Sequence, residues 1–528
     1  MRFRHTFICI LSLCLAASAA GQGQVRDFRY ALDANPLLGF HNAALLTTLG
    51  DEGFSEAVTT VSKENGAVIP LEGSPDSWTV DVGTEAFRRV SDRLVFSGSL
   101  AYTYFRGNRM GGQILMDPAG SLINFLEEDT ATMGPKKKEV YSLSGGLGYA
   151  FDGRWSGGIR FDYTAADQTK YKDPRFLNVL MDLTVSPGVS FKVSDAFSLG
   201  GNLIWRHSLE QLSGNIFGTM DRQYFILVDQ GGFLGAREIF DGDAGYVSTQ
   251  NVRPLANDRY GLGLQVAAGT RTRFFGQLTG LWRTGYFGNR TSTSVVFCEF
   301  RGPETKFEGI LLHPAGGNLH RLEWDAAARF PSKWTNIYNY KAEAGMNTTV
   351  EYQGQNETLT RADYQARLAY TLEKGVSGYR PDWVIGVSAD AFLRDQHTVL
   401  YPEYRDQSYL SLMVSLGAER NVKLSPGCLS VGADLLFGTG TGNAKTDGSY
   451  STGTSKQKSF DDWLYRQFEY DTASRAGAEL SLTWTWLGPK RVAPYLKLSD
   501  SFLSLLSEPQ YLQGRTRNVA AVTVGCNF

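Results

Sequence analysis

The chain has 528 residues, with 52 lysines and arginines against 54 aspartates and glutamates, so its formal net charge is −2. A charge this close to zero gives no reason to expect a nucleic-acid partner or a strongly acidic substrate. Beyond residue 20 only Cys298, Cys428 and Cys526 remain, too far apart for a disulfide framework or a metal-binding spacing. We therefore expect no metal and no cofactor.

The N-terminus has the pattern of a cleavable export signal. Arg2 and Arg4 precede an apolar run over residues 7–15, and residues 16–20 supply an Ala-x-Ala cleavage site. The run is shorter than the roughly 20 apolar residues that a membrane-spanning helix needs. We predict a signal peptide over residues 1–20, a periplasmic N-terminal segment over 21–53 and one barrel domain over 54–528.

Segments of strictly alternating character follow one another along the rest of the chain. In residues 140–151, Tyr141 and Leu143 share one parity with other large apolar residues, and serines and glycines share the other. Because side chains alternate between the two faces of a strand, such a segment has one apolar and one polar face. The same alternation recurs in residues 321–330 and 475–487.

Three features indicate that the apolar faces meet lipid. The segments are about 11 to 15 residues long, beyond the usual five or six of globular strands. Aromatic residues cluster near segment ends, as at Tyr102 and Tyr104 or Trp484 and Trp486, which suits an interfacial girdle. The polar faces carry charges, which fit a wet lumen better than a packed core. Since backbone groups in lipid must all pair, the sheet has to close.

We therefore predict an all-β fold, a transmembrane antiparallel up-and-down β-barrel of about 18 strands with 16 as the alternative. Short periplasmic turns alternate with long extracellular loops in such barrels. The turns include Asp152-Gly153 and Pro331-Ser332, and the long loops are expected at 107–137, 210–256, 287–317 and 440–472. The predicted strands are 54–62, 77–90, 93–106, 138–151, 154–167, 177–191, 196–209, 257–270, 273–286, 318–330, 333–350, 360–374, 381–394, 407–421, 427–439, 473–487, 490–505 and 515–528.

Projecting the polar faces inward predicts which charges line the lumen. The basic candidates are Arg89, Arg160, Arg206, Arg283, Arg321, Arg329, Lys341, Arg361, Arg367 and Arg394, with a similar number of carboxylates. Opposed carboxylates and guanidiniums would orient polar solutes, whereas cross-strand pairs would only stiffen the wall. The signs nearly balance, so strong ion selectivity is not predicted. We single out as candidate site residues Arg160, Asp162, Arg321, Glu323, Asp325, Arg329, Asp363 and Arg367.

Two of the predicted loops contain apolar stretches. Residues 114–116 and 122–126 lie in the first long loop, and residues 224–228 lie in the second. Such segments either pack into the barrel mouth and narrow the pore or form an outward docking patch. We favour inward packing.

The sequence constrains the function of this protein less than it constrains the fold. An 18-stranded barrel leaves an aqueous channel unless something fills it, and the segment before residue 54 is too short for the plug domain of a TonB-dependent transporter. His207 next to Ser208 lies on the apolar parity, and no nucleophile, base and orienting acid can be assembled, so we expect no enzyme. We expect a porin-like channel for passive or gated movement of small polar solutes. The alternative is a scaffold barrel that partners a surface lipoprotein, a transporter or a secretion complex.

The C-terminal segment 518–528 alternates and ends in Phe528, which resembles the closing-strand signal read by the outer-membrane barrel-insertion machinery. The expected partners are therefore outer-membrane lipid, that machinery and an envelope protein such as a lipoprotein. Three local motifs, at residues 35–39, 42–44 and 107–112 followed by Asp117-Pro118, make the chain similar to an uncharacterised family of Bacteroidota outer-membrane β-barrels. The resemblance implies the barrel fold and a bacterial outer-membrane location, and it transfers no functional residue.

Overall fold

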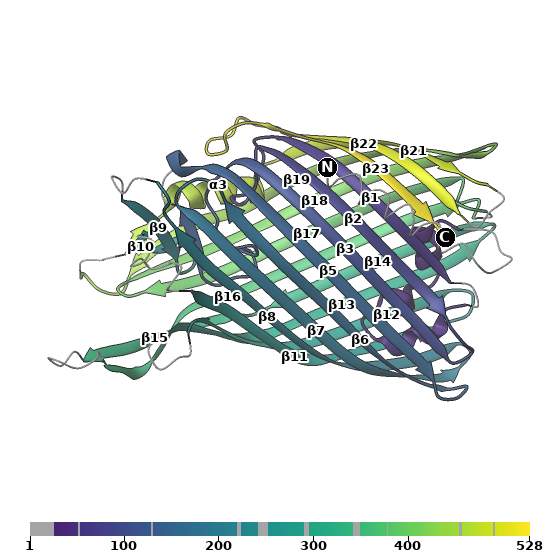
Figure 1. Ribbon diagram of the computed structural model, residues 1–528, viewed down its shortest axis with the longest axis horizontal. Helices are drawn as coiled ribbons and strands as arrows, with labels where there is room; N and C mark the ends of the chain where they lie inside the picture. Colours follow the sequence, from purple (N-terminus) through teal and green to yellow (C-terminus); the bar gives the residue numbers. More distant parts are fainter. Residues whose placement is uncertain are drawn as a thin grey trace.

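The barrel wall is one closed sheet. The computed structural model describes residues 26–50, 53–127, 130–218, 223–240, 252–289, 295–341, 349–376, 378–453, 457–488 and 492–528. In it, nineteen antiparallel strands form a continuous sheet, and β1 pairs with both β2 and β23, so that the first and last strands meet (Figure 1). The wall strands are β1 (Phe54–Gly66), β2 (Asp76–Arg89), β3 (Leu94–Met110), β5 (Gly134–Ala150), β6 (Trp155–Lys170), β7 (Arg175–Ser194), β8 (Phe197–Asn215), β11 (Arg253–Ala268), β12 (Arg273–Gly288), β13 (Val296–Ala315), β14 (Asn318–Arg329), β15 (Ser332–Lys341), β16 (Thr349–Lys374), β17 (Trp383–Leu400), β18 (Glu403–Leu424), β19 (Gly427–Ser449), β21 (Arg475–Trp486), β22 (Ala493–Leu505) and β23 (Thr516–Asn527).

Strands β14 and β15 share one position in the wall, which gives a barrel of 18 strands as predicted. Both pair with β13 on one side and with β16 on the other. The interruption between them lies at Phe330-Pro331, because proline has no N–H group to donate to the ladder.

Two details of the predicted strand list are therefore wrong. Pro331-Ser332 is no turn, so residues 333–350 are not a separate strand, and β13 occupies most of the predicted loop 287–317. The two errors offset each other in the count. Charged residues and Pro303 gave β13 the composition of a polar loop, although Glu304, Lys306 and Glu308 lie on its inward face. The predicted loop 440–472 also begins too early, because β19 continues to Ser449.

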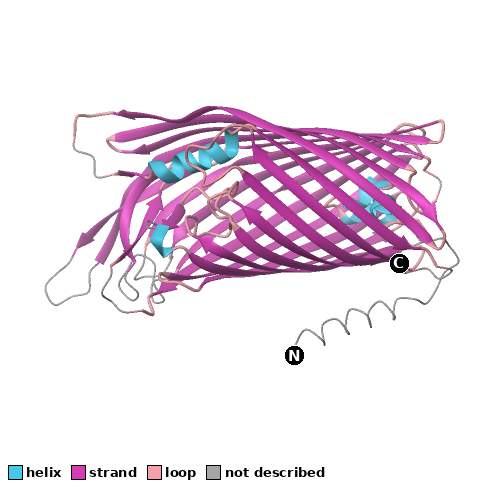
Figure 2. Cartoon of the chain, turned by 90° about the horizontal axis from the view of Figure 1, so that it is seen from above, coloured by secondary structure: helices cyan, strands magenta, loops and turns pink. Residues whose placement is uncertain are grey.

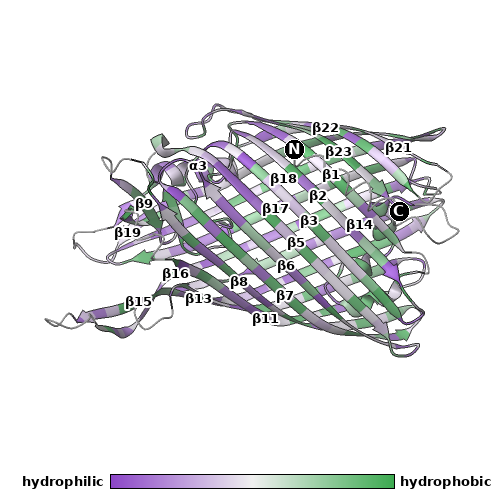
Figure 3. Cartoon of the chain, in the orientation of Figure 1, coloured by the Kyte–Doolittle hydropathy of each residue, from purple (hydrophilic) through white to green (hydrophobic). Residues whose placement is uncertain are grey.

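The outer face of the barrel is apolar and its inner face is polar. On β6, Ile159, Phe161 and Tyr163 are 48%, 43% and 38% exposed, while Arg160 and Asp162 between them point into the lumen. Figure 3 shows this alternation along the strands. A continuous apolar belt around a sheet without free edges matches the requirements of a lipid environment. The fold is a transmembrane barrel.

The two ends of the barrel differ. Short connections, such as those around Asp195 and Ser425, lie at the end that also holds the C-terminus, and the longer connections lie at the other (Figure 1). We refer to them as the periplasmic and extracellular ends. No helix within the described ranges is long and apolar enough to cross a membrane.

The extracellular half of the lumen contains segments of the long loops, which we call the extracellular plug. It consists of residues 111–127, a small sheet and a helix (Figure 2). The sheet has four strands, β4 (Asn124–Glu127), β9 (Tyr224–Asp229), β10 (Leu234–Phe240) and β20 (Lys458–Ser459), and the helix is α3 (Asp461–Thr472). A short 3₁₀ turn, η3 (Thr130–Thr132), follows β4.

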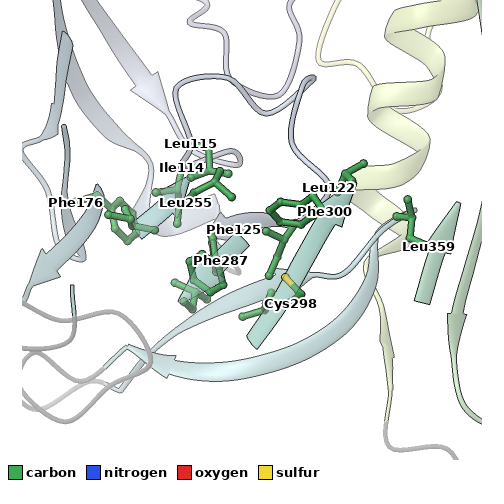
Figure 4. Close-up of a cluster of buried hydrophobic side chains, with 14 of the residues drawn as sticks. Ile114, Leu115, Leu122, Phe125, Phe176, Leu255, Phe287, Cys298, Phe300 and Leu359 are labelled. Carbon is green, nitrogen blue, oxygen red and sulfur yellow. The ribbon is translucent and has the colours of Figure 1, made fainter. Parts of the chain in front are cut away.

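An apolar cluster holds this plug against the wall. Ile114, Leu122 and Phe125 of the plug are at most 2% exposed and pack against inward-facing residues of β7, β8, β11, β12, β13 and β16 (Figure 4). Those wall residues include Phe176 and Phe287. The apolar stretches of the two loops therefore pack inward, as favoured from the sequence, because burying them removes their surface from water.

A second filler, the periplasmic plug, consists of residues 27–49 inside the opposite end (Figure 2). It contains α2 (Phe28–Asp33) and two 3₁₀ turns, η1 (Pro36–Gly39) and η2 (Ala43–Thr48). Leu38, Ala44 and Leu45 are at most 2% exposed. Residues 27–49 of the predicted N-terminal segment thus lie within the lumen, and the predicted signal peptide lies outside the described residues.

Candidate functional site in the lumen

Charged side chains of the wall anchor the periplasmic plug. Asp27 is 2.7 Å from the Arg380 guanidinium, and Asp33 is 2.6 Å from Arg321. Arg89 donates to the backbone carbonyl of Thr47 at 2.8 Å. Each contact joins a plug residue to a wall residue more than 40 positions away, so each depends on the tertiary structure.

Asn42 fixes the plug more deeply. Its Oδ1 accepts from the N–H of Ala44 and caps η2, while its Nδ2 donates to the carbonyl of Val189 and to Oε1 of Gln265, both at 2.9 Å. Asn42 is 1% exposed, so these bonds satisfy a buried amide.

Glycines in the wall leave the space that η2 occupies. A Cβ atom at Gly148 would lie 2.6 Å from the Ala43 carbonyl oxygen and 3.1 Å from Leu46 Cβ. Glycine within a strand often marks such a close approach of another backbone. The inward residues of β5 beside η2, Gly146 and Gly148, are therefore small because they face this plug.

A buried ion cluster anchors the extracellular plug. Glu127 of β4 lies between Lys136 of β5 and Lys170 of β6, and all three side chains are at most 2% exposed. Nζ of Lys136 is 3.5 Å from Oε1 of Glu127 and also donates to the Gln113 carbonyl at 3.0 Å. Lys170 pairs with Oε2, which also accepts from Thr132. Removal of the shared carboxylate would leave two cations in a dry environment.

Between plug and wall lies a polar cavity of about 590 Å³. Its wall carries six arginines, one from each of six strands, and we call them the arginine row. They are Arg206 (β8), Arg259 (β11), Arg283 (β12), Arg329 (β14), Arg361 (β16) and Arg394 (β17). Carboxyl groups of the cavity include Asp117, Asp229 and Asp471 on the plug side.

Two members of the arginine row hold the plug directly. Arg283 donates to the carbonyl of Gly120 at 3.0 Å, and Arg361 donates to those of Ser121 at 3.1 Å and Ala119 at 3.3 Å. Cations of the wall thus hold the backbone of the plug at residues 119–121.

The structure distributes the eight predicted site residues over the whole lumen. Arg160 and Asp162 pair with each other at 2.9 Å near His41 of the periplasmic plug, and Arg321 pairs with both Glu323 and Asp33 of that plug. Asp325 pairs with Lys306, and Arg367 pairs with Asp390. Only Arg329 and Asp363 line the cavity. The four charges on one face of β14 therefore do not form one site.

Sequence reasoning missed three charged residues of the cavity wall, Arg259, Glu304 and Glu210. Glu210 of β8 fell in the predicted loop 210–256, and Arg259 and Glu304 lie 3.0 Å apart as an ion pair. Glu304 was hidden because its strand was taken for a loop. Arg259 has the opposite parity to Tyr260 and Leu262, both about half exposed on the outside, and that alternation would have found it. Among the described residues no group of three potential ligands is arranged to hold a metal ion.

Similar solved structures are large barrels of low sequence identity. The ferric preacinetobactin receptor BauA from Acinetobacter baumannii is 9% identical with a TM-score of 0.35, covering 91% of this chain and 80% of its own. A FadL homologue from Pseudomonas aeruginosa is 10% identical at 0.32, covering 93% of each chain. A mutant of the ferric enterobactin receptor PfeA from the same organism is 10% identical at 0.40, covering 90% of this chain and 81% of its own.

At these scores the likeness carries no argument about function, and the barrel is established by its strand pairing. No curated protein matches the chain. One family model matches residues 43–528, from η2 of the periplasmic plug to the last residue. The chain therefore belongs to DUF6850, a family of unknown function.

Proposed function

We propose that this protein is a porin-like transport barrel of a bacterial outer membrane, through which small polar solutes move when the internal plugs are displaced. The observation that carries the proposal is the charged cavity inside an 18-stranded wall, with segments of the same chain in the lumen towards both ends. Export by a cleaved signal over residues 1–20, insertion by the barrel machinery and an origin in Bacteroidota belong to the same proposal.

Gated movement fits the lumen better than free diffusion. An unfilled barrel of this size would be an open channel, and here both plugs narrow it. Many anchoring contacts are hydrogen bonds to plug carbonyls, each worth about 0.5–1.5 kcal/mol net. Water or a solute can replace such bonds, so the contacts are reversible.

A scaffold barrel is the second candidate. The fifteen-residue apolar cluster between the extracellular plug and the wall favours it, because a plug so well packed can stay in place permanently. A lipoprotein or another envelope protein would then be the partner. Neither proposal includes catalysis.

Solute flux tests the proposal. Purified barrel is reconstituted into liposomes, and swelling is measured with uncharged sugars of increasing size, alongside single-channel recording in a planar bilayer. We expect brief, infrequent openings from the unmodified protein and long openings from variants in which a plug is released. Heat-modifiable gel mobility verifies the fold in every sample.

Either of two results would contradict gated transport. A permanently open conductance in the unmodified barrel would show that the plugs do not close the path. An absence of flux from every plug variant, with the fold intact, would favour the scaffold, and a stoichiometric partner should then co-purify.

A further inference from the structure

The arginine row has an unusual register for a β-sheet. Arg206 is directly opposite Arg259, and Arg259 is directly opposite Arg283 on the next strand. Like charges in directly opposed positions destabilise a sheet. Further along the wall, Glu304 is opposite Arg329, Arg329 is opposite Asp363, and Asp363 is opposite Arg394. The cations therefore follow neighbouring strands in nearly one row.

The carboxylates within this row are too few to match its arginines. Asp182 binds Arg206 at 2.8 Å, and Glu304 binds Arg259 at 3.0 Å. Asp363 is shared, since it lies 2.7 Å from Arg394 and 3.1 Å from Arg361. Three carboxylates thus serve six guanidiniums. Arg283 is 3.9 Å from Glu304 and has the neutral Asn257 side chain as its closest hydrogen-bond acceptor.

Five further carboxyl groups line the cavity, Glu72, Asp117, Glu210, Asp229 and Asp471, and the last four accept hydrogen bonds from groups other than the arginines. Asp229 accepts from the N–H of Gly231, and Asp117 accepts from that of Gly120. Glu210 accepts from Asn178, and Asp471 accepts from Gln467. Burial raises the pKa of the Asp229 and Asp471 carboxyls, which favours their neutral forms.

Several arginines of the row have guanidinium N–H groups that could bind a further acceptor. The Arg329 side chain is exposed to the cavity and makes neither a hydrogen bond nor an ion pair with any described residue. The Arg206 side chain is 45% exposed despite its bond to Asp182. Arg283 and Arg361 donate to neutral carbonyls, although guanidinium groups bind carboxylates and phosphates more strongly through paired, charge-assisted bonds.

We propose that the arginine row is a binding site for the anionic group, a carboxylate or a phosphate, of a small solute held in the cavity. The volume of about 590 Å³ lies within the usual range of ligand pockets. As a statement of the substrate class, this rests on the proposed transport function; as a binding site, it stands without it. Eight carboxyl groups and six guanidiniums line the whole cavity, so the positive charge is concentrated on the arginine row and not spread over the cavity.

Calorimetric titration of the full-length barrel in detergent tests the site. The probes are citrate, inorganic phosphate and an uncharged sugar. We expect citrate or phosphate to bind, with an affinity that falls at high ionic strength, and the sugar not to bind. The preferred anion distinguishes a carboxylate from a phosphate ligand.

Substitution locates the binding. Arg329→Gln removes a guanidinium without leaving an orphaned partner, and we expect it to weaken binding by about tenfold or more. The double variant Arg206→Gln, Asp182→Asn removes a complete ion pair and should weaken binding as well. Arg367→Gln is the matched control, because Arg367 also faces the lumen but lies outside the cavity.

The result that overturns the site is the absence of binding by either anion, or an equal loss of affinity in the control variant. Binding without solute flux from any plug variant would leave the anion site standing and refute transport. Flux without anion binding would refute the site and leave transport standing.

Discussion

Glu127→Gln is expected to release the extracellular plug. The substitution leaves the ammonium groups of Lys136 and Lys170 buried without a counter-charge, which costs about 3–5 kcal/mol for an ion cluster that loses one partner. Release of residues 111–127 into water removes that penalty. Hydrogen exchange should increase over these residues, and single-channel recordings should show longer openings. The wall strands keep their pairing, so heat-modifiable mobility should be unchanged.

Glu139→Gln is the matched control. Glu139 pairs with Lys137 on the outward face of the same strand as Lys136, and the two side chains are 19% and 29% exposed. Ion pairs near a surface contribute about 0–1 kcal/mol, so this variant should resemble the unmodified protein. An unchanged exchange rate and conductance in Glu127→Gln would mean that the apolar cluster alone retains the plug.

Gly148→Leu is expected to displace the periplasmic plug. A leucine side chain at this inward position would overlap Ala43, Leu46 and Thr47 of η2. Overpacking of this kind costs about 1–3 kcal/mol, and the plug can avoid it by leaving the lumen, whereas the wall cannot. Protease cleavage within residues 27–49 should appear, and the conductance should rise.

Gly280→Leu controls for the loss of a strand glycine. A Cβ at Gly280 would meet nothing within 4 Å, and the residue shares its parity with the outward-facing Leu278 and Trp282. Protease resistance of the plug and a normal conductance are expected. Cleavage in both variants alike would show that the effect comes from the strand and not from η2.

Different kinds of interaction hold the two plugs, so the two variants are expected to give different experimental results. The extracellular plug combines a buried ion cluster with a large apolar cluster, whereas polar contacts such as Asp27 with Arg380 accompany smaller apolar clusters at the periplasmic end. A lumen that opens in two steps is expected to show two conductance levels, each increased by one of the two variants.

The periodicity of the sequence determined the wall of this protein. Alternation with a period of two decides which side chains face lipid and which face the lumen, and it is a local property that a single chain displays. It identified the inward parity of Arg160 and Asp162 on β6 and of Arg329 on β14. At Pro331-Ser332 the sequence predicted a turn, so residues 333–350 were assigned to a separate strand, and β13 was assigned to a loop.

What lies inside the barrel was decided by the tertiary structure. The sequence showed that residues 114–116 and 224–228 are too apolar for water, but not which wall residues receive them. The plug contacts of Asp27 with Arg380, of Asn42 with Gln265 and of Arg361 with Ser121 join residues more than 200 positions apart. The arginine row likewise depends on the register between neighbouring strands. Closure of the sheet sets that register and brings these distant groups together. The register therefore cannot be predicted from the local sequence pattern of any one strand.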